Sequence, residues 1–109
     1  MTRYSFGDIV LVNFPFTDRS VIKRRPALVI IHDDDILLAR ITSKAKESPF
    51  DVPIVNWKES NLLFPSTIRL TKCVTFSPEL IDGKIGAISN SDKLSVIAAS
   101  RKLIDSLGE

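Results

Sequence analysis

Two stretches near the amino terminus, GDIVLVNFPFTD at residues 7–18 and KRRPALVI at residues 23–30, decide the fold of this chain. Each contains a run of Val, Leu and Ile, side chains that favour extended strands. Cations on a loop between the strands of a rigid sheet are a common arrangement for holding a phosphate backbone. The polar segment between the two apolar runs carries four of them: Arg19, Lys23, Arg24 and Arg25.

The rest of the chain alternates short apolar runs with turn residues. A first strand is expected at residues 8–14, because Pro15 has no amide to donate to a sheet and ends it. The three aspartates at 33–35 are typical of a tight hairpin turn. Residues 81–88 contain two glycines and are expected to form a turn with a short extended piece. Further strands are expected at 27–32, 36–42, 51–56, 66–70 and 72–76, the last two of which can form one long bent strand.

The carboxyl-terminal part predicts a helix. Ser89 is followed three residues later by Asp92, the spacing of a capping box, and Gly108 is well placed to end the helix. Apolar residues recur at spacings that keep one face: Leu94, Ile97, Ala98, Ile104 and Leu107. Five to seven short strands and one terminal helix predict a small, strongly bent antiparallel sheet or open barrel.

Composition limits the class of protein. With 109 residues the chain is expected to form one domain, residues 1–109, and its net charge of +2 is too small to indicate nucleic-acid binding unless the charge is clustered. Cys73 is the only cysteine and is expected to be a small core residue in a reducing, cytoplasmic protein. No apolar run reaches the roughly 18 residues that a membrane span needs, and Arg3 and Asp8 interrupt any signal peptide.

Several pieces of the chain, in order, resemble the PemK/MazF-like toxin family over roughly residues 5–107. They are residues 7–18, 25–30, 41–43, 48–52, 66–70 with Lys72, 75–76, and the terminal helix. The resemblance implies an SH3-like small barrel of the MazF/CcdB type with a C-terminal α-helix. It also implies a homodimeric, metal-independent, sequence-specific endoribonuclease that needs no cofactor, cleaves single-stranded RNA and is neutralised by a cognate antitoxin. Family members often carry a glutamate five residues before the arginine, whereas this chain has Ser20 there and its nearest acidic residue is Asp18.

The resemblance implies that Arg25 and Thr42 are catalytic. The Arg25 guanidinium offers a planar, permanently charged fork of donors to a phosphate, and the Thr42 hydroxyl can donate to the same group. Without the resemblance, the two read as a surface arginine at a strand entry and a β-branched strand residue. The polar residues expected to contact RNA, which could also form a solvated surface, are Thr17, Asp18, Arg19, Lys23, Arg24, Ser43, Lys44, Lys46 and Ser66.

Other residues leave alternatives open. Phe16, Phe50 and Trp57 can stack on bases, pack on the barrel surface or lie at a dimer interface. His32 beside the three aspartates suggests a metal site, but consecutive aspartates on a tight turn cannot all face one ion, so the turn is favoured and no metal is expected. Two other functions stay open: a non-catalytic, CcdB-like toxin that binds a protein, and an RNA-binding barrel without turnover.

Overall fold

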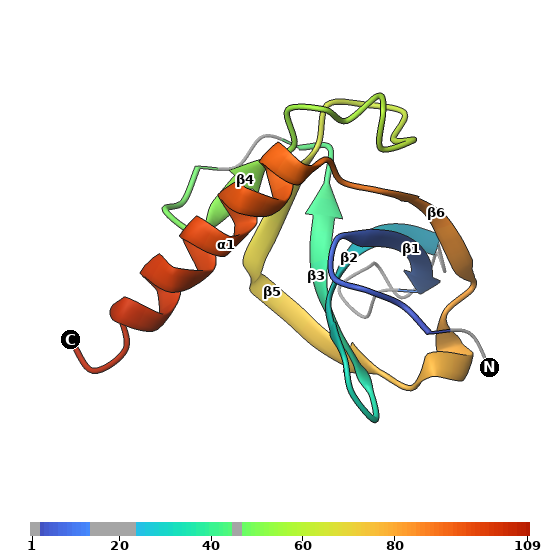
Figure 1. Cartoon of the computed structure of the whole chain (residues 1–109), viewed down its shortest axis with the longest axis horizontal. Helices are drawn as coiled ribbons and strands as arrows, with labels where there is room; N and C mark the ends of the chain where they lie inside the picture. The colour runs from blue at the N-terminus through green and yellow to red at the C-terminus, as the bar shows by residue number, and fades with distance from the viewer. Residues whose placement is uncertain (1–2, 14–23, 45–46) are drawn as a thin grey trace.

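The computed structural model describes residues 3–13, 24–44 and 47–109, which form an antiparallel sheet and one long helix (Figure 1). A tight turn at residues 33–35 joins the second and third strands, as the three aspartates predict, and Asp33 N donates to Asp35 O at 2.9 Å. The elements are β1 (Asp8–Asn13), β2 (Arg24–His32), β3 (Ile36–Thr42), β4 (Asp51–Pro53), β5 (Thr67–Phe76), the 3₁₀ helix η1 (Pro78–Leu80), β6 (Gly83–Ala87) and α1 (Asn90–Asp105).

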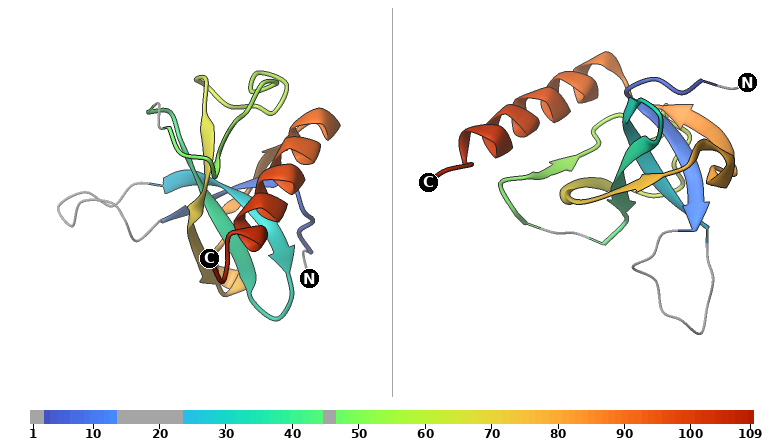
Figure 2. Two further views of the ribbon diagram at one scale, coloured as in Figure 1. Left: turned by 90° about the vertical axis from the view of Figure 1, so that its left-hand side faces the viewer. Right: turned by 90° about the horizontal axis from the view of Figure 1, so that it is seen from below.

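The strands form one sheet in the order β4-β5-β3-β2-β1-β6, with every neighbouring pair antiparallel. The predicted fold class is confirmed, with the refinement that the sheet is bent but open, since β4 and β6 lie at its two edges (Figure 2). The runs predicted at 66–70 and 72–76 form the single strand β5. An irregularity in its pairing with β3 lets Ala39 pair with Cys73 and Arg40 with Arg69. The strand predicted at 51–56 is shorter, because β4 ends at Pro53.

Apolar residues pack on both faces of the bent sheet. Successive strand residues point to opposite faces, so Leu28 joins one core cluster and Val29 the other. The helix and the segment at 54–66 cover the first cluster through Val96 and Leu62. The second cluster is closed by Tyr4, Val74, Phe76 and Ile81.

Cys73 is not the core residue that the sequence predicts. It is exposed, because the residues of β5 after the irregularity alternate between half-buried Val74 and solvent-facing neighbours. Its Sγ lies 3.1 Å from the carbonyl oxygen of Leu70, to which it donates. Desolvation of the sulfur raises the pKa of the thiol.

The helix α1 begins as predicted but buries a different face. Ser89 Oγ accepts a hydrogen bond from Asp92 N at 3.2 Å, as an N-cap should. The buried positions are Asp92 and Val96, whereas Leu94, Ile104 and Leu107 of the predicted apolar face are 67%, 63% and 73% exposed, respectively. The helix runs away from the sheet toward the carboxyl terminus, so the later residues have little to pack against (Figure 2). None of the helices in the described part of the chain is long and apolar enough to cross a membrane.

Candidate functional site

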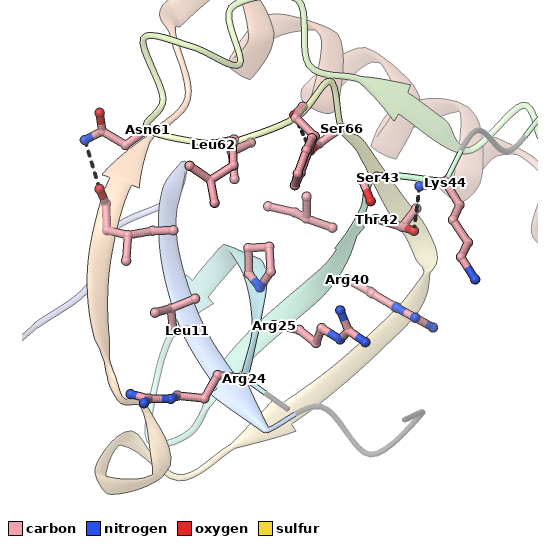
Figure 3. A pocket seen from close by; sticks show the side chains of 15 residues that line it. Leu11, Arg24, Arg25, Arg40, Thr42, Ser43, Lys44, Asn61, Leu62 and Ser66 are labelled. Carbon is pink, nitrogen blue, oxygen red and sulfur yellow. Dashed lines mark hydrogen bonds between the residues drawn. The ribbon is translucent and has the colours of Figure 1, made fainter. Parts of the chain in front are cut away.

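A cleft of about 400 Å³ lies between the ends of β2 and β3 on one side and the segment at residues 54–66 on the other (Figure 3). Its apolar lining comes from several elements of the sheet and from this segment, and includes Leu11, Pro26, Ile41, Leu62 and Ile85. The polar lining includes six residues that the sequence predicts as site residues, which the fold therefore brings together: Arg24, Arg25, Thr42, Ser43, Lys44 and Ser66. The other predicted contacts lie outside the described residues: Thr17, Asp18, Arg19, Lys23 and Lys46.

Arg25 and Thr42 come from neighbouring strands, and both line the cleft. The pairing of β2 with β3 ends at Ala27 and Arg40, and Arg25 and Thr42 each lie two residues beyond this pair, at the same end of the two strands. Arg25 is half-buried, and its Nε is buried without a hydrogen-bond partner among the described residues. Buried N–H groups are nearly always paired in folded proteins, so this donor is available to a bound acceptor.

Two hydroxyl groups of the cleft differ in what they can do. Thr42 Oγ1 accepts a hydrogen bond from Lys44 N at 3.2 Å, which leaves its proton free to be donated. Ser66 Oγ donates to Phe64 O at 2.8 Å, so its proton is already engaged in holding the wall of the cleft. Thr42 is therefore the better donor to an anion.

Arg24 and Arg25 are neighbours in sequence but point in different directions (Figure 3). The Arg24 guanidinium turns toward Asp82, with Nε 4.0 Å from Oδ2, and both side chains are largely exposed. An ion pair of this length and exposure contributes little to stability. Arg24 is thus a loosely held cation at the edge of the cleft, and Arg25 a half-buried one inside it.

The opposite wall of the cleft, residues 54–66, is tied to the rest of the molecule by hydrogen bonds. The buried Asp92 carboxylate accepts from Val55 N and Asn56 N, both at 3.0 Å. Asn61 Nδ2 donates to Ile85 O at 3.0 Å. Only glycine fits at position 86, because a Cβ there would collide with the carbonyl oxygen of Ser60. The sequence identifies Asp92 only as a helix-capping residue, since its contact with residues far earlier in the chain leaves no local pattern.

Sequence reasoning misses Arg40, which lines the cleft together with Leu63 and Phe64. Arg40 lies two residues before Thr42, and this spacing places the two side chains on one face of β3, a signal that could have identified it. Leu63 and Phe64 are exposed at the rim.

The remaining candidates are structural. Phe50 and Trp57 are half-buried against the first core cluster, and Phe16 lies outside the described residues. His32 is buried, accepts a hydrogen bond from Tyr4 N on Nδ1 at 2.9 Å and stacks on the Tyr4 ring. Within residues 3–13, 24–44 and 47–109, no group of three or more His, Cys, Asp or Glu side chains is arranged to hold a metal ion.

Comparison with known proteins adds two kinds of evidence. No curated protein sequence matches the chain. Solved structures share its fold at low sequence identity. An endoribonuclease in complex with its cognate antitoxin, from a mycobacterial species, is 12% identical with a TM-score of 0.78 and covers 98% of this chain and 100% of its own. The Mycobacterium tuberculosis toxin MazF-mt6 is 19% identical with a TM-score of 0.73, over 90% of this chain and 96% of its own.

A third similar structure, MazF from Deinococcus radiodurans, is 19% identical with a TM-score of 0.72 and covers 96% of this chain and 99% of its own. Identities this low establish the fold and no more. The family model is decisive, because it matches residues 5–104, nearly the whole chain. This chain belongs to the PemK-like, MazF-like toxins of type II toxin–antitoxin systems.

Proposed function

We propose that this toxin is an endoribonuclease that cleaves single-stranded RNA without a metal ion. The observation that supports this most is the Arg25 Nε–H, buried and unpaired among the described residues, in a cleft that Thr42 also lines. The similar mycobacterial structure named as an endoribonuclease supports the same activity. In this reaction the 2′-oxygen of the RNA attacks the neighbouring phosphorus and the bond to the 5′-oxygen breaks. The products are a 2′,3′-cyclic phosphate and a 5′-hydroxyl.

Arg25 and Thr42 supply the charge stabilisation that this reaction needs. Negative charge builds on the non-bridging phosphate oxygens in the transition state, and preorganised donors in a partly dry cleft stabilise it strongly. Arg25 offers a fixed fork of charged donors and Thr42 a neutral one from the facing strand. Because both are held on sheet strands, little reorganisation is needed when the substrate binds.

The RNA strand follows the cationic side of the cleft. Arg24, Ser43 and Lys44 contact its backbone at the edge, and Ser66 contacts it from the opposite wall. The other residues proposed to contact the RNA lie in the segments next to these in sequence: Thr17, Asp18, Arg19, Lys23 and Lys46. Asp18 is the acidic residue nearest in sequence to Arg25 on its amino-terminal side and is the proposed group for proton transfer.

The test is cleavage of a long unstructured RNA by the purified protein in the presence of excess chelator. We expect cleavage to continue, with a cyclic phosphate at the new end, and to stop when the cut site carries a 2′-O-methyl group. DNA of the same sequence should not be cut. Loss of cleavage with chelator, or cleavage at a 2′-O-methyl position, contradicts the mechanism. RNA that is bound but never cut supports instead the RNA-binding barrel without turnover.

The active form is proposed to be a homodimer that a cognate antitoxin neutralises. Large apolar side chains are exposed on the single chain at the rim of the cleft, on α1 and just after it: Leu63, Phe64, Leu94, Ile104 and Leu107. Apolar surface of this kind indicates protein contacts. Trp57 is half-buried and Leu62 is buried, so these two apolar residues add little to this surface. Light scattering at micromolar concentration should give about twice the chain mass, and a fully active monomer contradicts the dimer.

A further inference from the structure

We propose that Arg40 forms a second phosphate subsite in the cleft, beside the one at Arg25, so that the protein holds two successive phosphates of one RNA strand. The inference rests on the proposed function for the identity of the ligand. Its structural basis is separate: a row of charged residues across four neighbouring strands, and the charge of the cleft lining.

The row is set by the strand register. Asp51 of β4 pairs with Arg69 of β5, and Arg69 pairs with Arg40 of β3. Arg40 pairs in turn with Ala27 of β2, and Arg25 lies two residues from Ala27 on the same face. Arg25 and Arg40 are thus diagonal neighbours, a separation of about 7–8 Å between Cα atoms. This is comparable to the spacing of successive phosphates along a single strand.

Only one of the three arginines in this row has an anionic partner among the described residues. Arg69 Nε lies 3.3 Å from Asp51 Oδ1, the Asp51 side chain is 2% exposed, and its other oxygen, Oδ2, is buried without a hydrogen-bond partner among the described residues. Like charges directly opposite each other in a sheet are destabilising. The ion pair reduces the repulsion of Arg40 by Arg69, but Arg40 and Arg25 themselves form no ion pair within the described part of the chain.

The lining of the cleft gives these two arginines no protein partner. Its described residues include four cations, Arg24, Arg25, Arg40 and Lys44, and no aspartate or glutamate. Figure 3 shows the Arg25 and Arg40 side chains extending on the same side of the strands. Half-buried guanidinium groups without a carboxylate are what a site for a phosphodiester anion requires.

The arrangement predicts opposite effects on stability and on binding. In the free protein, Arg40 is repelled by its two arginine neighbours. Replacing it by glutamine should therefore raise the melting temperature at low salt, while it removes one phosphate contact. A structural arginine behaves differently, because its loss lowers the melting temperature. Arg40→Lys should keep the charge but lose the planar fork, so its affinity for RNA should lie between those of the wild type and Arg40→Gln.

The experiment compares the wild type, Arg40→Gln, Arg40→Lys and the control Arg101→Gln, which removes an exposed cation of α1. The probe is a labelled single-stranded RNA with 2′-O-methyl groups throughout, and affinity is measured against salt concentration. The slope of the logarithm of affinity against the logarithm of salt concentration reports the number of phosphate contacts. We expect Arg40→Gln to reduce the magnitude of this slope by about 0.7, the value for one phosphate contact on a single strand. Arg101→Gln should leave the slope unchanged. Sodium phosphate should raise the melting temperature of the wild type more than that of Arg40→Gln.

Equal slopes for Arg40→Gln and Arg101→Gln overturn the subsite, and so does a lower melting temperature of Arg40→Gln at low salt. Because the probe cannot be cut, the result does not depend on turnover. A protein that binds the probe through Arg40 but cleaves no RNA refutes the proposed nuclease and leaves the subsite intact. A protein that cleaves RNA normally while Arg40 makes no difference to binding refutes only the subsite.

Discussion

The two sides of the cleft differ in whether their polar groups are hydrogen-bonded within the protein. On the side of residues 54–66, polar groups are paired: Asp92 accepts two backbone N–H bonds, and Asn56 Oδ1 accepts from Ser89 Oγ at 2.8 Å. On the strand side, Arg25 Nε is buried with no described partner, and Arg40 faces another arginine. Unpaired buried donors are rare in folded proteins. The strand side therefore keeps donors free for a ligand, while the loop side maintains the shape of the cleft.

This difference predicts where a substitution acts. Changes on the strand side should reduce activity while the free energy of unfolding stays close to the wild-type value, because the groups removed make few contacts in the free protein. Changes on the loop side should reduce the free energy of unfolding first, and activity only through it.

Arg25→Ala should have the largest effect. We expect turnover to fall by about 10² to 10³-fold, the usual loss when one preorganised donor to the transition state is removed. The melting temperature should not fall, because the Arg25 Nε has no described partner to lose. Single-turnover cleavage and thermal unfolding measure the two effects. Arg25→Lys is the matched variant and should recover only part of the rate, since an ammonium group lacks the planar fork. A folded Arg25→Ala protein with normal turnover removes Arg25 from the mechanism.

Thr42→Val should come second. Valine keeps the β-branched shape that suits a strand, so the fold should persist. The hydroxyl donor to the phosphate is lost, and hydrogen bonds to charged groups of this kind are worth about 1.5–3 kcal/mol, or about 10- to 100-fold in rate. Lys44 N loses its acceptor but lies at an exposed position where water can replace it. Thr42→Ser keeps the hydroxyl and is the control; equal losses in both variants would mean that shape, not the donor, matters.

Asp92→Ala tests the loop side. It leaves Val55 N and Asn56 N without their acceptor and removes a contact between the helix and residues 54–66. Each lost hydrogen bond costs about 0.5–1.5 kcal/mol, so the loss of two should lower the free energy of unfolding by about 1–3 kcal/mol. Urea denaturation measures it, and Asp105→Ala, at an exposed position of the same helix, is the control. If the variant keeps wild-type stability but loses RNA cleavage, the contrast between the two sides is wrong.

The sequence predicts the strand side of the cleft better than the loop side, for a physical reason. Arg25 and Thr42 lie on strands joined by a tight turn at residues 33–35, so a short hairpin brings them to the same end of the sheet, although an irregularity between Val29 and Ile31 shifts the pairing that the turn alone would set. The spacing of two residues between Arg40 and Thr42 carries the same kind of local information. The six described site residues that line the cleft all lie on or next to strands whose apolar runs are clear in the sequence.

The features that could not be predicted depend on contacts between distant parts of the chain. Asp51 meets Arg69 only through the pairing of β4 with β5, and Asp92 reaches back to Val55. Periodicity along α1 indicates an apolar face, but not which surface covers it, and the helix buries Val96 rather than Leu94. Cys73 is exposed because an irregularity in β5 changes which residues face solvent, and apolar composition does not reveal an irregularity.

The smallest effect is expected at the edge of the cleft, where Arg24 combines features of both sides. Its pairing with Asp82 at 4.0 Å is weak and exposed, so Arg24→Ala should leave the free energy of unfolding nearly unchanged. It should weaken binding of a non-cleavable RNA and reduce the magnitude of the logarithmic salt slope by about 0.7. Asp82→Ala is the opposite test, since it frees Arg24 and removes a negative charge near the strand. Binding should then become tighter at low salt, and the gain should disappear as salt screens the charges. If Asp82→Ala weakens binding instead, Asp82 positions Arg24 rather than competing with the RNA for it.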